Sequence, residues 1–120
     1  MTPLKFRIKP LPEAHHYFEV IIFSSSTALR KFATSLGLTG PIIAGTHLRE
    51  GEHLRKIGYI FFYPQSLVPD IIAHEVDHAA TFYIGEYLHK RMRRIYTDPN
   101  ADEFRAQMVA RLNRQILDYL

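Results

Sequence analysis

The first half of the chain alternates short apolar runs with polar breaks. Residues 17–23 are rich in aromatic and β-branched side chains, a composition that favours a buried strand. Residues 24–27 are serines and a threonine, which can supply an N-cap for a helix over residues 28–36, and Gly37 is suited to end that helix. Residues 1–16 are expected to form an N-terminal extension of the domain.

Two further apolar runs, residues 42–48 and 57–63, flank the polar segment 49–53. This arrangement predicts two strands joined as a hairpin, with Pro64 ending the second strand. Because the first run precedes the inner strand of the pair, residues 42–48 are expected to form an exposed edge of the sheet.

The second half of the chain has helical periodicity. Pro69 suits a first helical turn, and the apolar positions that follow share one face of a helix over residues 69–94. Asp98 and Pro99 then supply an N-cap and a first turn for a final helix over residues 99–120. The apolar stripe of that helix comprises Ala101, Phe104, Met108, Leu112, Ile116 and Tyr119.

The element order β-α-β-β-α-α predicts an α+β domain in which helices pack on one small, mostly antiparallel sheet. A length of 120 residues and a hydrophobic content of 47% fit a single folded domain over residues 1–120. No stretch reaches the roughly 18 apolar residues of a membrane span, and the N-terminus lacks the apolar core of a signal peptide. We therefore expect a cytoplasmic protein that makes no membrane contact.

The polar face of the 69–94 helix carries an HExxH motif, which reads HEVDH at residues 74–78. His74 and His78 differ by about 40° around a helix, so both imidazoles can reach one zinc ion at about 2.0–2.1 Å. Glu75 lies beside them and is suited to take the proton of a zinc-activated water. The motif therefore predicts a zinc-dependent hydrolase, and the competing interpretation is a histidine pair on a solvated helix face.

The absence of cysteine excludes a thiolate zinc site, so nitrogen and oxygen ligands must hold the metal. A catalytic zinc site also needs a third protein ligand beside the two histidines. Glu86 and His89 lie about 12 and 16 Å along the same helix from His78, which is too far to share its metal.

Glu103 is the preferred third ligand. It lies off the apolar stripe of the final helix, and small residues follow it on the same side, which permits close approach of a second helix. Asp102 is adjacent but turned by about 100°, and its side chain is shorter. His47 or His53 from the hairpin are the remaining alternatives.

The chain contains His74-Glu75-x-x-His78 followed by Glu103-x-x-Ala106-x-x-Val109-Ala110. This pattern resembles the small gluzincin-type metallopeptidases of bacterial and phage genomes, including peptidases that cleave repressors. The resemblance covers about residues 42–120 and implies a minimal zincin-like domain with one zinc ion per chain and a polypeptide substrate. In that family two histidines and a later glutamate hold zinc and the motif glutamate is the general base, which correspond here to His74, His78, Glu103 and Glu75.

The chain departs from two extended forms of the motif. Thr81 and Ile84 stand where the metzincin motif HExxHxxGxxH has glycine and histidine. Residues 102–107 read DEFRAQ, which differs from the NExxSD sequence of thermolysin-type enzymes. The sequence therefore leaves the hydrogen-bond partners that would orient the two histidines unassigned.

The implied chemistry is hydrolysis of a peptide bond. Zinc lowers the pKa of its water to about 7, Glu75 takes the proton, and the same carboxyl group later returns it to the leaving amine. The developing oxyanion needs a further donor, and an extended substrate is expected to add to the edge of the hairpin. The candidate contacts to the substrate or transition state are Tyr59, Tyr63, His47 and His53.

The alternative function is a catalytically inactive protein that keeps the zincin scaffold and binds a host protein or nucleic acid. Glu75 distinguishes the two, because hydrolysis needs this carboxylate and a structural zinc site does not. The net charge is +3 and the positive charge is densest in residues 89–94, but cations also favour a helix C-terminus. This run therefore predicts a solvated helix end and not a nucleic-acid site. The sequence sets no oligomeric state.

Overall fold

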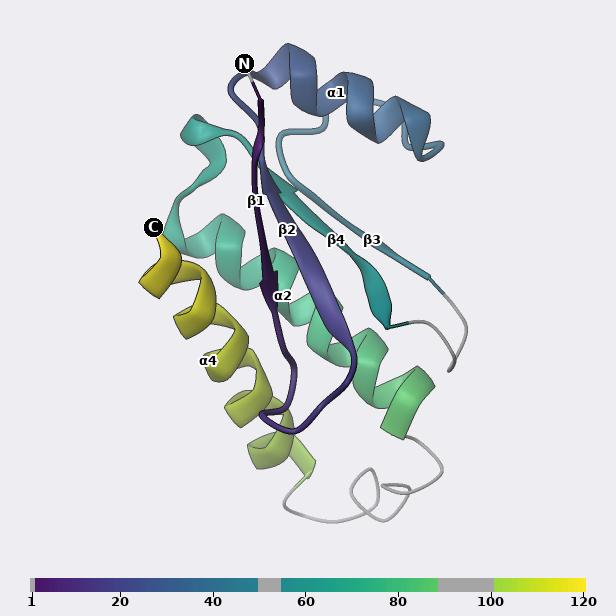
Figure 1. Cartoon of the computed structure of the whole chain (residues 1–120), viewed down its shortest axis with the longest axis vertical. Helices are drawn as coiled ribbons and strands as arrows, with labels where there is room; N and C mark the ends of the chain where they lie inside the picture. The colour runs from purple at the N-terminus through teal and green to yellow at the C-terminus, as the bar shows by residue number, and fades with distance from the viewer. Residues whose placement is uncertain (1, 50–54, 89–100) are drawn as a thin grey trace.

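The computed structural model describes residues 2–49, 55–88 and 101–120, except for the side chains of residues 87, 88, 101 and 102. Within these ranges one sheet is built from the strands β1 (Leu4–Ile8), β2 (Tyr17–Ile22), β3 (Gly45–Leu48) and β4 (Lys56–Phe62). The α-helices are α1 (Ser26–Ser35), α2 (Pro69–Tyr83) and α4 (Ala101–Tyr119), and α2 lies between a 3-10 turn (Pro64–Ser66) and a π-helical turn (Ile84–Leu88) (Figure 1). The result is a compact α+β domain of order β-β-α-β-β-α-α.

The sheet has the strand order β1-β2-β4-β3 and is mixed. β1 and β2 pair antiparallel, β2 and β4 pair parallel, and β3 and β4 pair antiparallel. The predicted pairing of the two central runs is confirmed, with Gly45 opposite Phe61 and Leu48 opposite Gly58. β3 lies at an edge of the sheet, as predicted, although the strand begins at Gly45 and not at residue 42. The parallel pair arises because α1 and β3 intervene in the chain between β2 and β4.

The N-terminal extension predicted for residues 1–16 is wrong in one respect, because it contains β1. Phe6 and Ile8 of this strand are buried, whereas Lys5, Arg7 and Lys9 are exposed. A strand at the edge of a sheet with one solvated face shows only a short alternation of apolar and charged residues. That pattern is weaker than the continuous apolar run of β2, which is an interior strand.

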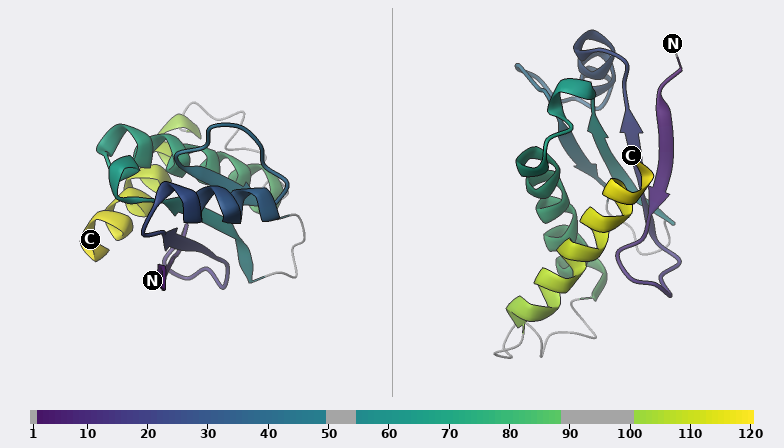
Figure 2. Two further views of the ribbon diagram at one scale, coloured as in Figure 1. Left: turned by 90° about the horizontal axis from the view of Figure 1, so that it is seen from above. Right: turned by 90° about the vertical axis from the view of Figure 1, so that its left-hand side faces the viewer.

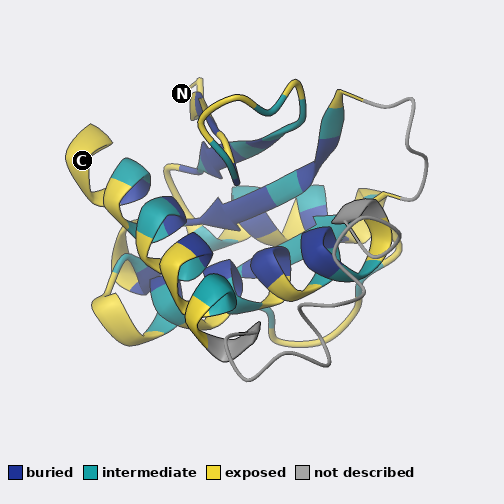
Figure 3. Ribbon diagram, turned by 90° about the horizontal axis from the view of Figure 1, so that it is seen from below, coloured by how far each residue is buried: buried dark blue, intermediate teal, exposed yellow. Residues whose placement is uncertain are grey.

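Side chains alternate between the two faces of the sheet and build two cores. On one face, Phe18 and Ile60 of the sheet pack with Val76 of α2 and Leu112 of α4. On the other face, a smaller core joins the sheet to α1 and contains Ile21, Phe23, Leu29, Ala33 and Phe61. Figure 2 shows α2 and α4 together on one side of the sheet, and Figure 3 shows their buried positions turned toward it.

The helix ends follow the local sequence. Ser25 is the N-cap of α1, where its Oγ accepts a hydrogen bond of 3.2 Å from the backbone N–H of Ala28. Gly37 follows α1 with a φ of 85°, a conformation that favours glycine. α2 begins at Pro69 as predicted, and the predicted continuation to residue 94 lies beyond the described residues after 88. Among the helices described, none is long and apolar enough to cross a membrane.

Candidate metal centre and general base

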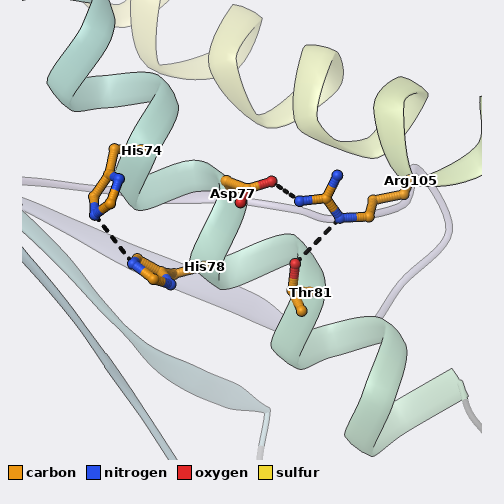
Figure 4. Close-up of polar contacts among 5 residues, drawn as sticks. All are labelled: His74, Asp77, His78, Thr81 and Arg105. Carbon is orange, nitrogen blue, oxygen red and sulfur yellow. Dashed lines mark hydrogen bonds and ion pairs between the residues drawn. The ribbon is translucent and has the colours of Figure 1, made fainter. Parts of the chain in front are cut away.

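His74 and His78 lie one turn apart on the exposed face of α2, and their rings turn toward one another (Figure 4). Their Nε2 atoms are 3.1 Å apart and the ring planes are nearly perpendicular, at 89°. A tetrahedral zinc ion with Zn–N bonds of about 2.0–2.1 Å places two nitrogens roughly 3.3–3.4 Å apart. The pair would therefore need to open by only a few tenths of an ångström to share a metal. Without one, the two rings can share an N–H···N hydrogen bond.

Within the described part of the chain, the Nδ1 atoms of His74 and His78 lack the hydrogen bonds that usually orient metal-binding histidines. Among the described residues, neither Nδ1 donates a hydrogen bond to a carboxylate or a carbonyl oxygen. Histidines that bind metals usually make such a bond, and its loss typically weakens metal affinity about 10–100-fold. The ring orientation therefore depends on the helix backbone and on the contact between the two rings.

Glu75 points to a different side of α2 and is buried, with 6% of its surface exposed. Its Oε1 accepts a hydrogen bond of 2.9 Å from the hydroxyl of Thr46 on β3. The same hydroxyl lies 3.1 Å from the backbone carbonyl oxygen of Glu75. Among the described residues, the buried side-chain nitrogen and oxygen atoms without a partner are His47 Nδ1 and Asn113 Oδ1. Oε2 of Glu75 makes no hydrogen bond to the described residues.

The opposite flank of the histidine pair is tied to α4. Arg105 on α4 pairs with the carboxylate of Asp77, and its Nε donates a hydrogen bond of 3.2 Å to the hydroxyl of Thr81 (Figure 4). Asp77 and Thr81 are four residues apart and therefore lie on one side of α2. The exposed face of α2 is thus bordered by β3 on the Glu75 side and by α4 on the Asp77 side.

The structure does not bring the expected third ligand to the histidines. Glu103 is exposed in the first turns of α4, and its Oε1 accepts a hydrogen bond of 3.2 Å from Nε2 of Gln107. Among the side chains that the structure describes, no group of three or more histidine, aspartate or glutamate residues is placed to hold a metal. Of the alternatives, His53 and the side chain of Asp102 lie outside the described part of the chain.

Three of the candidate substrate contacts lie on the face of the sheet that is turned away from α2. Tyr59 and Tyr63 pack in the core beside α1, where Tyr59 makes an edge contact with Phe32 at a ring separation of 5.3 Å. His47 is opposite Tyr59 in the β3–β4 pairing and alternates with Thr46, so its side chain faces away from α2. The motif and these side chains are therefore separated by the sheet itself.

Thr46 and Arg105 are site residues that the sequence patterns did not single out. Thr46 stands between Ala44 and Leu48, both of which pack against the core beneath α2. A hydroxyl at such an inward position needs a hydrogen-bond partner, and this requirement is a signal that could have identified Thr46. Arg105 offers no comparable signal, because half-exposed arginines on helices are common.

Comparison with protein-family models, curated proteins and solved structures finds no match to this chain. Function must therefore be argued from the site itself. The site combines two convergent imidazoles, a carboxylate at the next position of α2 that Thr46 holds by one oxygen, and a neighbouring sheet edge. The two imidazoles can supply two ligands to one metal ion, and the Glu75 carboxylate can accept a proton.

Proposed function

We propose that this protein is a zinc-dependent peptidase in which His74 and His78 bind the metal and Glu75 is the general base. The observation that carries the proposal is the 3.1 Å approach of the two Nε2 atoms on the helix that also presents Glu75. A hydrogen bond between two exposed imidazoles replaces bonds that each ring could make with water, so its net contribution is small. Shared coordination of a metal gives a stronger reason for this side-chain arrangement.

In the proposed reaction the two histidines bind the metal and Glu75 transfers the proton. Zinc bound at the histidines would polarise the scissile carbonyl and make the attacking water more acidic. Oε2 of Glu75, the carboxylate oxygen that Thr46 does not hold, takes the proton of that water as the water oxygen bonds to the carbonyl carbon. The carboxyl group then gives the proton to the nitrogen of the leaving amine as the C–N bond breaks, and Glu75 returns to its starting state.

Substrate would lie as an extended peptide along β3, the edge strand that carries Thr46. Backbone groups on the free side of an edge strand can pair with an added strand, and this mode of peptide binding requires no side-chain specificity. The scissile bond would then lie between the sheet edge and the exposed face of α2. The resemblance to gluzincin-type peptidases supports the same placement and supports a zincin-like interpretation of the fold.

Metal content and peptide cleavage test the proposal. Purified metal-free protein should take up one zinc ion per chain, and the loaded protein should cleave members of a mixed peptide library detected by mass spectrometry. Glu75→Gln should keep the zinc and lose cleavage, because an amide cannot accept the proton. Loss of zinc in Glu103→Ala would identify Glu103 as the third ligand. A zinc-loaded wild-type protein that cleaves no peptide would overturn the proposal.

One observation favours the alternative of an inactive zincin scaffold that binds a host protein or nucleic acid. The described residues supply two metal ligands and no third, which is one fewer than a catalytic zinc site needs. In that case Glu75→Gln should leave the biological activity of the protein unchanged. The same variant therefore separates the two functions, because a peptidase loses its activity and a binding protein keeps it.

A further inference from the structure

We infer that Thr46 is a positioning residue that holds the carboxylate of Glu75 in the orientation needed for proton transfer. The inference rests on the proposed function, because it concerns the general base of that reaction. Thr46 belongs to β3 and Glu75 to α2, so the contact joins the sheet edge to the motif helix across 29 residues of sequence.

The contact has two parts. The hydroxyl of Thr46 lies 2.9 Å from Oε1 and 3.1 Å from the backbone carbonyl oxygen of Glu75, so both acceptors of one residue compete for its single proton. The shorter contact is to the carboxylate, and hydrogen bonds to charged acceptors are the stronger ones. The bond therefore holds the carboxylate with one oxygen against Thr46 and leaves its second oxygen without a hydrogen bond to the described residues, so that the plane of the group is fixed relative to β3.

The position of Thr46 is itself set by the sheet. β3 is four residues long and, among the described strands, pairs with β4 alone. Its approach to β4 is close because Gly58 has no side chain: a Cβ at that position would lie 2.2 Å from the carbonyl oxygen of His47. The backbone of β3 therefore fixes where the Thr46 hydroxyl meets Glu75.

Two substitutions separate the hydroxyl from the shape of the side chain. Thr46→Val keeps the branched shape and removes the donor, whereas Thr46→Ser keeps the donor and removes a methyl group. Thr46→Val should lower kcat by about 10- to 100-fold with unchanged KM and zinc content, because general-base catalysis typically contributes about 100- to 10,000-fold and only its orientation is lost. Thr46→Ser should stay within about threefold of wild type. Thr46→Ala removes the same hydroxyl and replaces Thr46→Val if the latter does not fold.

A second measurement follows the carboxylate directly in the metal-free protein. Glutamate labelled with carbon-13 at Cδ gives one NMR signal per residue, and the signal missing from Glu75→Gln belongs to Glu75. This signal should shift in Thr46→Val and stay near its wild-type position in Thr46→Ser. An unshifted Glu75 signal in Thr46→Val would refute the inference.

The two measurements also separate failure of the inference from failure of the proposed function. A shifted signal with an unchanged kcat in Thr46→Val would show that the contact exists and does not position the base, and the peptidase proposal would stand. A wild-type protein that binds zinc and cleaves no peptide would overturn both the peptidase proposal and the catalytic role of Thr46. In that case the NMR comparison would still decide whether Thr46 holds the carboxylate.

Discussion

Replacing Gly58 with alanine should loosen β3 from the sheet and disturb the Glu75 carboxylate at the same time. The added Cβ would lie 2.2 Å from the carbonyl oxygen of His47 and 3.0 Å from Cα of Leu48. Both are backbone atoms of β3, so no rotation of a side chain relieves the overlap. The strand must retreat by about 1 Å to restore ordinary van der Waals contact.

The loss in free energy of unfolding can be estimated from the overlap of the added Cβ with the backbone of β3. Overpacking a buried position typically costs about 1–3 kcal/mol, and each weakened hydrogen bond between β3 and β4 adds about 1 kcal/mol. We therefore expect Gly58→Ala to lower the free energy of unfolding by about 3 kcal/mol, which leaves a domain of ordinary stability folded. Because β3 carries Thr46, its retreat should also move the Glu75 NMR signal.

Urea denaturation of wild type, Gly58→Ala and Gly37→Ala measures this effect. Gly37 is a suitable control because its φ of 85° strains any other residue, while no atom lies within 4 Å of its added Cβ. Gly37→Ala should cost about 1–2 kcal/mol and leave the Glu75 signal in place. A Gly58→Ala protein within about 0.5 kcal/mol of wild type would refute the reasoning, since it would mean that β3 can move away from β4 without loss.

Three further predictions concern the metal, the helix contact and the basic run. His78→Ala should abolish stoichiometric zinc binding in a calorimetric titration. The control His15→Ala, which changes an exposed histidine far from the motif in sequence, should keep zinc binding. In wild type the zinc affinity should weaken as the pH falls, because protons compete with zinc for the ring nitrogens. Arg105→Ala should cost less than about 1 kcal/mol in urea denaturation, because the ion pair with Asp77 is about half exposed, and a larger loss would show a structural role beyond charge. Residues 90–94 lie outside the described part of the chain, and any DNA binding through them should be weak and fall steeply with salt; sequence-selective binding at physiological salt would contradict this.

The elements that the sequence predicts well are those whose signal is local. The run at residues 17–23 becomes β2, and Pro69 opens α2, because strand propensity and helix starts depend on a few neighbouring residues. The spacing of His74 and His78 is equally local, since it follows from the pitch of one helix. These features needed no knowledge of how the elements pack.

The errors arise where two elements must be placed relative to each other. Tyr59 and His47 were plausible substrate contacts until the strand register assigned them to the face beside α1. Alternation along a strand separates neighbours such as Thr46 and His47 onto opposite faces, but sequence does not say which face meets α2. The contact between Thr46 and Glu75 depends on that assignment.

The position of the expected third ligand, Glu103, also depends on how two elements pack, in this case on the rotation of α4 relative to α2. Arg105 faces α2 through Asp77 and Thr81, and Glu103 lies two residues earlier, which is about 200° around α4. The rotation of α4 that places Arg105 against α2 therefore turns Glu103 away, toward its contact with Gln107. A motif within one helix can specify two ligands and a base, but the remaining ligand depends on how a second helix is rotated. In this protein the buried stripe of α4, formed by Met108, Leu112 and Ile116, sets that rotation.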